Sequence, residues 1–126
     1  LVMGYEIKLK IGTIFTFSAQ DKPELDQFAE IDLCKCGHGE LNRLSERKPS
    51  KASPAVSFYE QDQDERQTKD AYGNEHPAIP IQEVIDALEK DSQGETYRRF
   101  VWALGLLKAM QAPDETEKLV CIFYGH

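Results

Sequence analysis

Cys34, Cys36 and His38 alternate along the chain and form the cluster best suited to chemistry. Successive side chains of a strand point to opposite faces, so these three would share one face if a strand persists there. Thiolates and imidazole are the ligands that zinc prefers in a tetrahedral shell, and Cys121 and His126 could complete it. The spacing is not that of a known zinc knuckle, and cysteines on strands are usually small buried hydrophobic residues. Two interpretations therefore stay open: a zinc site, or core and turn residues that bind no cofactor.

The same cluster raises the hypothesis of an enzyme with a non-standard site, because Lys35 and His38 lie beside the thiols and could lower their pKa. No other motif supports catalysis. The serine-hydrolase pattern G-x-S-x-G and the metalloprotease pattern H-E-x-x-H do not occur in the sequence. The acidic run that starts at Asp62 has Gln67 where a calcium loop requires glycine. We therefore expect no enzymatic activity.

Glycines flank His38, at Gly37 and Gly39, just before a segment expected to form a short helix. The N-terminus of a helix exposes backbone N–H groups and a positive dipole end, which together attract anions. Basic side chains follow closely: Arg43, Arg47, Lys48 and Lys51. This arrangement predicts, as an alternative function, the binding of a nucleotide or another small anion. The simpler interpretation is a glycine turn followed by a solvated basic loop.

A polar loop near the middle of the chain carries Asp70, Tyr72 and Asn74. Polar loops on a rigid scaffold often carry binding residues, so these three are candidates for contact with a ligand or a partner. They could equally form the end of a plain hairpin, since Tyr72, Gly73 and Asn74 are typical of a turn.

The longest apolar run, residues 96–111, contains the only tryptophan and is expected to form a central helix. Its inward face is predicted from the helical spacing of apolar residues: Tyr97, Phe100, Val101, Leu104 and Leu107, with Ala103 and Met110 at the edge. The other side carries Arg98 and Arg99, but also Trp102 and Leu106, which a solvated face would not normally present. Trp and Arg are enriched at interface hot spots, so these four residues are a candidate partner-binding patch. The alternative is a helix covered on both sides by its own domain.

The spacing of apolar residues along the chain predicts the strands and helices that position these candidate residues. Apolar side chains alternating with Lys8 and Lys10 predict a half-buried strand at residues 5–11, which continues to Phe17 either as one strand bent at Gly12 or as a hairpin turning there. Further strands are expected at residues 28–36, 55–59, 77–79 and 119–124, and short helices or turns at residues 18–26 and 40–46. Residues 81–88 show helical spacing after Pro80, which suits a first helical turn.

This order of strands, two helices and a strand predicts one α+β domain over residues 1–126. We expect an antiparallel-rich sheet of about four to six strands, a C-terminal helix pair on one face and a final C-terminal strand. Residues 45–54 and 60–76 are polar and are expected to be mobile loops. Leu1 and Val2 precede Met3, so we expect the natural chain to start at Met3.

Charge and cysteine usage exclude several classes of function. The chain has a net charge of −7, concentrated in residues 60–95, which hold eleven acidic and three basic side chains. Nucleic-acid binding generally requires a basic surface, so we do not expect it. No apolar run approaches the ~18 residues of a membrane span and no signal peptide is visible, so we expect no membrane association. Three cysteines without a disulfide framework favour a reducing, cytoplasmic location.

The leading hypothesis is a small acidic interaction module that binds another protein or itself, of the inhibitor, immunity, or phage and mobile-element accessory type. A protein that binds a small anionic ligand is the alternative. An enzyme or zinc-binding protein with a site around Cys34, Cys36 and His38 is the third hypothesis.

Overall fold

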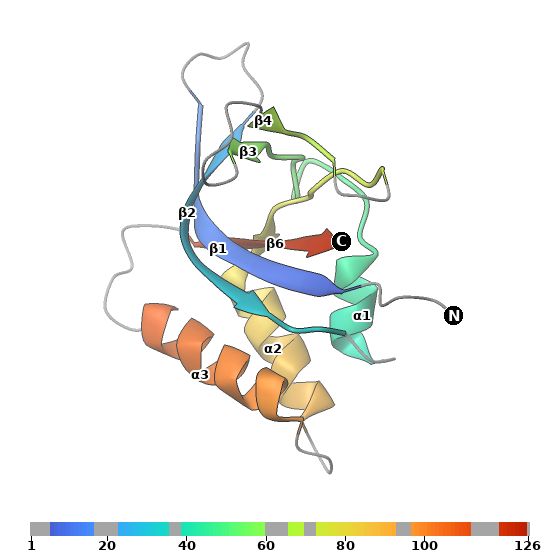
Figure 1. Ribbon diagram of the computed structural model, residues 1–126, viewed down its shortest axis with the longest axis vertical. Coiled ribbons are helices and arrows are strands. Elements are labelled where there is room, and N and C mark those ends of the chain that lie inside the picture. The colour runs from blue at the N-terminus through green and yellow to red at the C-terminus, as the bar shows by residue number, and fades with distance from the viewer. Residues whose placement is uncertain are drawn as a thin grey trace.

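Four antiparallel strands form the main sheet, in the order β2-β1-β6-β5 (Figure 1). The computed structural model describes residues 6–16, 23–35, 39–59, 66–69, 73–92, 97–111 and 119–125. In chain order its elements are β1 (Ile7–Phe15), β2 (Glu24–Asp32), α1 (Glu40–Ser45), β3 (Phe58–Tyr59), β4 (Arg66–Gln67), β5 (Ile79–Pro80), α2 (Ile81–Asp91), α3 (Arg98–Gln111) and β6 (Val120–Gly125). The fold is therefore α+β, as the sequence predicts.

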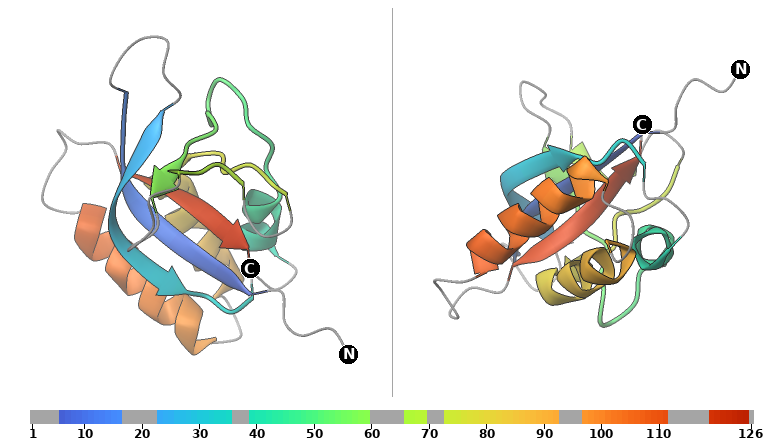
Figure 2. Two further views of the ribbon diagram at one scale, coloured as in Figure 1. Left: turned by 45° about the horizontal axis from the view of Figure 1, so that its top comes forward. Right: turned by 90° about the horizontal axis from the view of Figure 1, so that it is seen from below.

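Helices α2 and α3 cover one face of the sheet, α3 lying beneath β1 and β2 (Figures 1 and 2). The core on this side combines buried residues of three strands and three helices: Ile7, Leu9, Ile11, Leu41, Ile79, Ile81, Val84, Ile85, Ala87, Leu88, Phe100, Ala103, Leu107, Cys121 and Phe123, together with Leu33. Burying each large apolar side chain is worth roughly 1.5–3 kcal/mol, so this layer is the main source of stability. The helical spacing over residues 81–88 is confirmed by α2, which buries Ile81, Val84, Ile85 and Leu88, and the predicted C-terminal strand is confirmed by β6.

The opposite face of the sheet is also covered, by β3, β4 and the segments beside them (Figure 2). A second buried cluster lies there, formed by Leu25, Val56, Phe58, Ala78, Val120 and Ile122. Backbone bonds fasten the covering segments to each other, with Val56 N–H donating to His76 O and Ala78 N–H donating to Pro54 O, each at 2.9 Å. The sheet is thus enclosed between two apolar layers.

Lys10 points into this second layer and is only 1% exposed, whereas the alternation along β1 predicts a solvent-facing lysine. Its ammonium lies 2.6 Å from Glu30 Oε1 on β2 and donates to Gln27 Oε1 at 3.3 Å. It also lies 4.8 Å from the ring centroid of Phe58 and 5.4 Å from that of Tyr124. The charge can be buried because a carboxylate and two aromatic faces compensate it locally.

β1 is one continuous strand, which decides between the two arrangements predicted around Gly12. Its register with β2 shifts between Ile11 and Gly12, where Phe28 is the additional residue of β2. A side chain at residue 12 would place its Cβ 1.9 Å from the carbonyl oxygen of Asp26. Glycine is required at this bulge because the two backbones approach too closely for any Cβ.

The second strand differs from its predicted range, residues 28–36. It begins at Glu24, where a turn or short helix was expected, and it ends at Asp32. The Asp32 carboxylate accepts the N–H of Cys34 at 2.8 Å, and Cys34 has a φ of 66°. This local side-chain bond competes with the strand ladder and stops the strand before the cysteines.

The α3 helix ends at Gln111, as predicted, but begins at Arg98, two residues later than predicted, and the prediction that Val101 faces inward is wrong. Phe100 and Leu107 are buried, whereas Val101 is 42% exposed. The helix is rotated so that Ala103, predicted at the edge, is fully buried. Ala103 belongs to the helix-side core.

Replacing Lys10 should show that its buried ion pair holds the second layer in place. Lys10→Ala is expected to lower the free energy of unfolding by about 2–4 kcal/mol, because it removes a packed stem and leaves Glu30 without its cation. Lys10→Met, which keeps the stem, should cost roughly half as much. Lys8→Ala on the same strand is the control and should cost less than about 0.5 kcal/mol. Urea unfolding measures all three, and equal losses for Lys8 and Lys10 would contradict this role.

Candidate functional site

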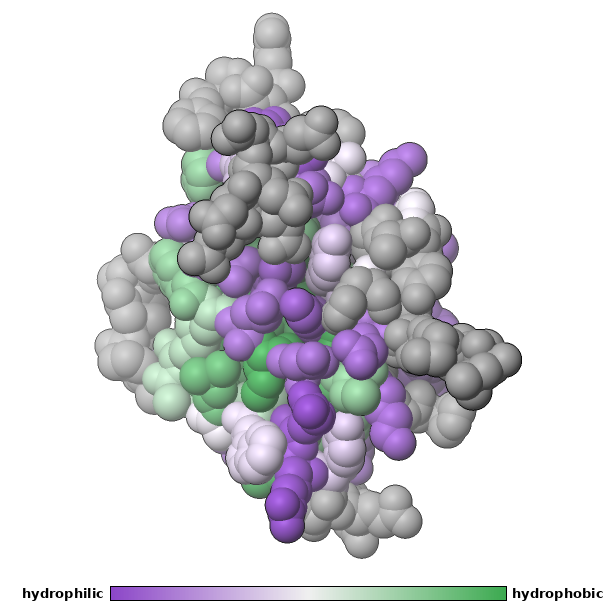
Figure 3. Space-filling model, in the orientation of Figure 1, coloured by the Kyte–Doolittle hydropathy of each residue, from purple (hydrophilic) through white to green (hydrophobic). Residues whose placement is uncertain are grey.

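The outer side of α3 carries the largest exposed apolar residues of any helix in the described part of the chain. Trp102 is 60% exposed and Val101 is 42% exposed. Arg98, Gly105 and Ala109 are exposed at neighbouring helical positions. We call these five residues the α3 outer face. Figure 3 shows hydrophobic side chains gathered over α3 and the neighbouring part of β2, with hydrophilic side chains beside them.

The structure divides the partner-binding patch predicted from the sequence. Arg98 and Trp102 lie on the α3 outer face, but Leu106 is half-buried and packs against the helix-side core. Arg99 turns back to the sheet, where its Nη1 donates to Asp32 O at 2.6 Å. In the described chain the helix is therefore covered on one side, and Trp102 faces outward.

The first turn of α3 is fastened to the end of β2. The Tyr97 hydroxyl donates to Leu33 O at 3.2 Å, and the Lys35 ammonium lies 5.6 Å from the Tyr97 ring centroid. Burial, and then the nearby Cys34 thiol, raise the pKa of Tyr97, so its hydroxyl stays protonated as a donor. Together with Arg99, these contacts fix the rotation of the helix and hence the direction of Trp102.

Gly105 lies in the middle of the exposed side of α3, where it costs about 1 kcal/mol of helix stability relative to alanine. The sequence suggests that another element packs closely there. In the described residues no atom lies within 4 Å of the position that a Cβ would occupy. Within this part of the chain, nothing accounts for a glycine at that position.

The structure does not bring the two described cysteines together. Cys34 follows the end of β2, whereas Cys121 lies in β6 opposite Ile11 and is fully buried in the helix-side core. Burial raises the pKa of Cys121 to about 12, so it is a neutral thiol and a poor metal ligand. No group of His, Cys, Asp and Glu side chains able to hold a metal occurs among the described residues. Cys36, His38 and His126 lie outside them.

An internal carboxylate occupies the helix N-terminus that was expected to attract an anion. The two Asp91 oxygens, at the end of α2, accept the N–H groups of Glu40 and Leu41 at 2.9 Å each. Gly39 makes this contact possible, since a Cβ there would lie 2.3 Å from Asp91 Oδ1. A phosphate would therefore have to compete with Asp91. Arg43 points to solvent and pairs with Glu40 at 3.4 Å, while Gly37 and His38 lie outside the described residues.

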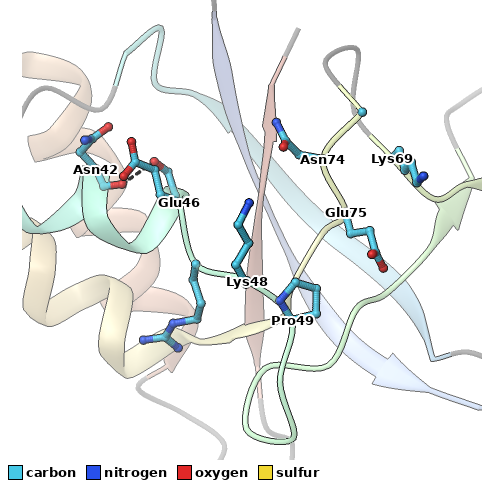
Figure 4. Close-up of a pocket in the computed structure, with 10 residues that line it drawn as sticks. Asn42, Glu46, Lys48, Pro49, Lys69, Asn74 and Glu75 are labelled. Carbon is cyan, nitrogen blue, oxygen red and sulfur yellow. Dashed lines mark hydrogen bonds between the residues drawn. The ribbon is translucent and has the colours of Figure 1, made fainter.

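A polar cavity of about 550 Å³ lies between the α1 side of the molecule and the segments at residues 69 and 73–75. We call it the loop pocket; its lining is Asn42, Ser45, Glu46, Arg47, Lys48, Pro49, Lys69, Gly73, Asn74 and Glu75. Figure 4 shows Lys48 between its two walls, with Asn42 and Glu46 on one side and Asn74 on the other. Asn74 was a sequence candidate, whereas Asp70 and Tyr72 lie outside the described residues.

One wall of the loop pocket is held by Arg47. Its guanidinium donates to both Glu83 oxygens, at 2.7 and 3.0 Å, and to Ser53 Oγ at 3.0 Å. The hydrogen bonding between Arg47 and Glu83 raises the pKa of Arg47 and lowers the pKa of Glu83. The sequence showed Arg47 as one of several basic loop residues, but it gave no indication that Glu83 fixes it.

Searches against protein-family models, curated proteins and solved structures return no significant match to this chain. Among the described helices, none has both the length and the apolar content that crossing a bilayer requires.

Asp91→Ala should lower the free energy of unfolding by about 1–2 kcal/mol, because two N–H groups of α1 lose a charged acceptor. Asp86→Ala, on the exposed side of the same helix, loses one exposed bond from Gln82 and should cost less than about 0.5 kcal/mol. Chemical denaturation measures both. If the two substitutions cost the same, Asp91 does not cap α1.

The bond between Arg47 and Glu83 should make stability depend on pH in a specific direction. A lowered pKa in the folded state means that the stabilisation is complete above the ordinary glutamate pKa and is lost as pH falls through the folded value. Arg47→Gln should therefore lower the melting temperature slightly at pH 7, and the difference from wild type should narrow as pH falls below the ordinary glutamate pKa of about 4.3. Arg43→Gln is the matched control and should show no such pH-dependent difference. A gap for Arg47→Gln that is as wide at acidic pH as at pH 7 would contradict the assignment.

Proposed function

We propose that this protein is an interaction module whose working surface is the α3 outer face. The observation that carries the proposal is the 60% exposure of Trp102 beside an exposed Val101 on a helix whose rotation is fixed. Trp side chains are strongly enriched at the centres of protein interfaces. The same residues have no part in the described core.

The physical argument concerns what the exposed residues gain from a partner. Each Å² of apolar surface removed from water contributes roughly 25 cal/mol, and Trp102 offers the largest exposed apolar side chain described. A tryptophan loses little conformational entropy on binding because it has only two side-chain torsions. A fixed helix loses none of its backbone freedom on binding, so the α3 outer face is preorganised.

The charge of α3 sets it apart from the rest of the chain. Its charged residues are Arg98, Arg99 and Lys108, with no acidic residue, whereas the whole chain has a net charge of −7. Arg99 and Lys108 contact Asp32 and Glu89 of the same chain. Arg98 has no ion pair among the described residues, so it is available to a partner's acidic group or backbone carbonyl.

Binding of a small anionic ligand is the second candidate function, and the loop pocket is the observation that favours it. Its volume of about 550 Å³ is in the usual range for small-molecule sites. Lys48 and Lys69 line it, but Glu46 and Glu75 do too, which weakens its attraction for anions. We rank this function below protein binding for that reason.

The test is affinity capture from cells that express the protein naturally, with quantitative mass spectrometry of wild type and Trp102→Ser. Proteins bound through α3 should fall at least tenfold with Trp102→Ser. Tyr59→Ser is the matched control, because Tyr59 is an aromatic residue of similar exposure, 50%, on β3. An unchanged melting temperature must accompany each variant. If both variants retain the same set of bound proteins, the α3 outer face is not the working surface.

A further inference from the structure

The α3 outer face carries both a protruding side chain and an adjacent gap, and we infer that it pairs with the same face of a second copy of this chain. Trp102 and Gly105 are three residues apart and therefore neighbours on one side of the helix. Trp102 protrudes, whereas no atom of the described residues fills the space where a side chain of residue 105 would stand. This inference rests on the proposed function, because it names one partner of the same surface.

A two-fold axis at the level of Ala103 and Leu104 makes the face complementary to itself. Two α3 helices then run antiparallel, and facing residue numbers add to a constant. Trp102 of each copy lies opposite Gly105 of the other, so each indole covers the gap that the described chain leaves open. Arg98 likewise lies opposite the small Ala109, and Val101 lies opposite Leu106, which is half-buried in its own chain.

Charge favours the antiparallel direction. A cation at the N-terminus of its own helix is unfavourable, and α3 begins with Arg98 and Arg99 and has no acidic residue in its first turn. Arg99 is accounted for by its bonds to Asp32. In the antiparallel pair, Arg98 passes the small side chain of Ala109 and reaches the last turn of the other α3, which is the negative end of that helix.

The same direction keeps like charges apart. The two Arg98 side chains would lie at opposite ends of the pair, about 16 Å apart along the helix axis, which is beyond the screening length of about 8 Å. A parallel pair would instead place Arg98 against Arg98 and Trp102 against Trp102, leaving both glycine gaps unfilled.

The surface area of the α3 outer face limits the affinity expected for the dimer. A face of 14 residues is about 21 Å long, and two such faces bury on the order of 1,000 Å² in total. That is near the lower limit for a specific interface, and the net charge of −7 on each copy opposes association. The pair is therefore a weak dimer that forms in the micromolar range.

Sedimentation velocity from about 5 to 500 µM, combined with fluorescence of the only tryptophan, tests the inference. The wild-type protein should shift from monomer to dimer, and its emission should move to shorter wavelength over the same concentrations as the indole leaves water. Gly105→Gln should remain folded, because that position is open and exposed, and it should weaken the dimer at least tenfold by blocking the gap. Lys90→Gln, on the exposed side of α2, is the matched control and should behave as wild type.

The antiparallel direction of the two α3 helices is tested by disulfide trapping, in which peptide mapping identifies the cross-linked residues. A mixture of Arg98→Cys and Ala109→Cys chains should give the 98–109 cross-link, whereas Arg98→Cys alone should give no 98–98 cross-link. A 98–98 product would overturn the antiparallel arrangement.

A monomer at every concentration, or a dimer that Gly105→Gln leaves unchanged, would overturn the inference. These outcomes are distinct from failure of the proposed function. If the protein stays monomeric but Trp102→Ser still loses a captured protein, the face binds a different partner and the second copy is excluded. If Trp102→Ser also loses nothing, both proposals fail.

Discussion

The ion pair between Lys10 and Glu30 lies between the sheet and its second covering layer, where an isolated ammonium would cost several kcal/mol. The position of the surrounding residues follows from that cost. Glu30 must lie opposite Lys10 on β2, and Phe58 and Tyr124 must turn their ring faces toward the Lys10 ammonium. Both the β1–β2 register and the placement of β3 over the sheet are therefore constrained by one charge. His76, fully buried and 5.5 Å from the Tyr124 ring, belongs to the same environment.

On the other face, the helices are fixed to one another and to the sheet by polar contacts at their ends. Asp91 at the end of α2 caps α1, and Arg99 and Tyr97 join the start of α3 to the end of β2. These contacts lie around an apolar core that fixes which side of α3 faces inward. The outward direction of Trp102 is a result of this arrangement rather than of local disorder.

Sequence patterns predicted the features that depend on neighbouring residues. The apolar spacing of α2, the alternation in β1 and the short apolar run of β6 each specify an element, and their order specifies an α+β fold. Trp102 and Arg98 were also recognisable as an unusual pair on the outer side of a helix.

The features that could not be predicted depend on residues distant in sequence. Lys10 looks like a solvated strand residue until Phe58 and Tyr124 cover it, and Asp91 looks like an ordinary helix end until Glu40 and Leu41 donate to it. The cysteine cluster assumed a strand that Asp32 ends early. Arg99 and Leu106 were assigned to the partner-binding patch because helical spacing shows which residues share a side, but not how far the helix is rotated.

The two edges of the main sheet differ in a way that bears on solubility. β5 has only two residues and ends in Pro80, which has no N–H to offer to another strand. β2 is longer, but its edge is interrupted by the bulge at Phe28 and carries Asp26, Glu30 and Asp32. Short length, proline, irregularity and negative charge each oppose strand addition from another molecule. Growth into fibrils through the edges of the main sheet is therefore disfavoured.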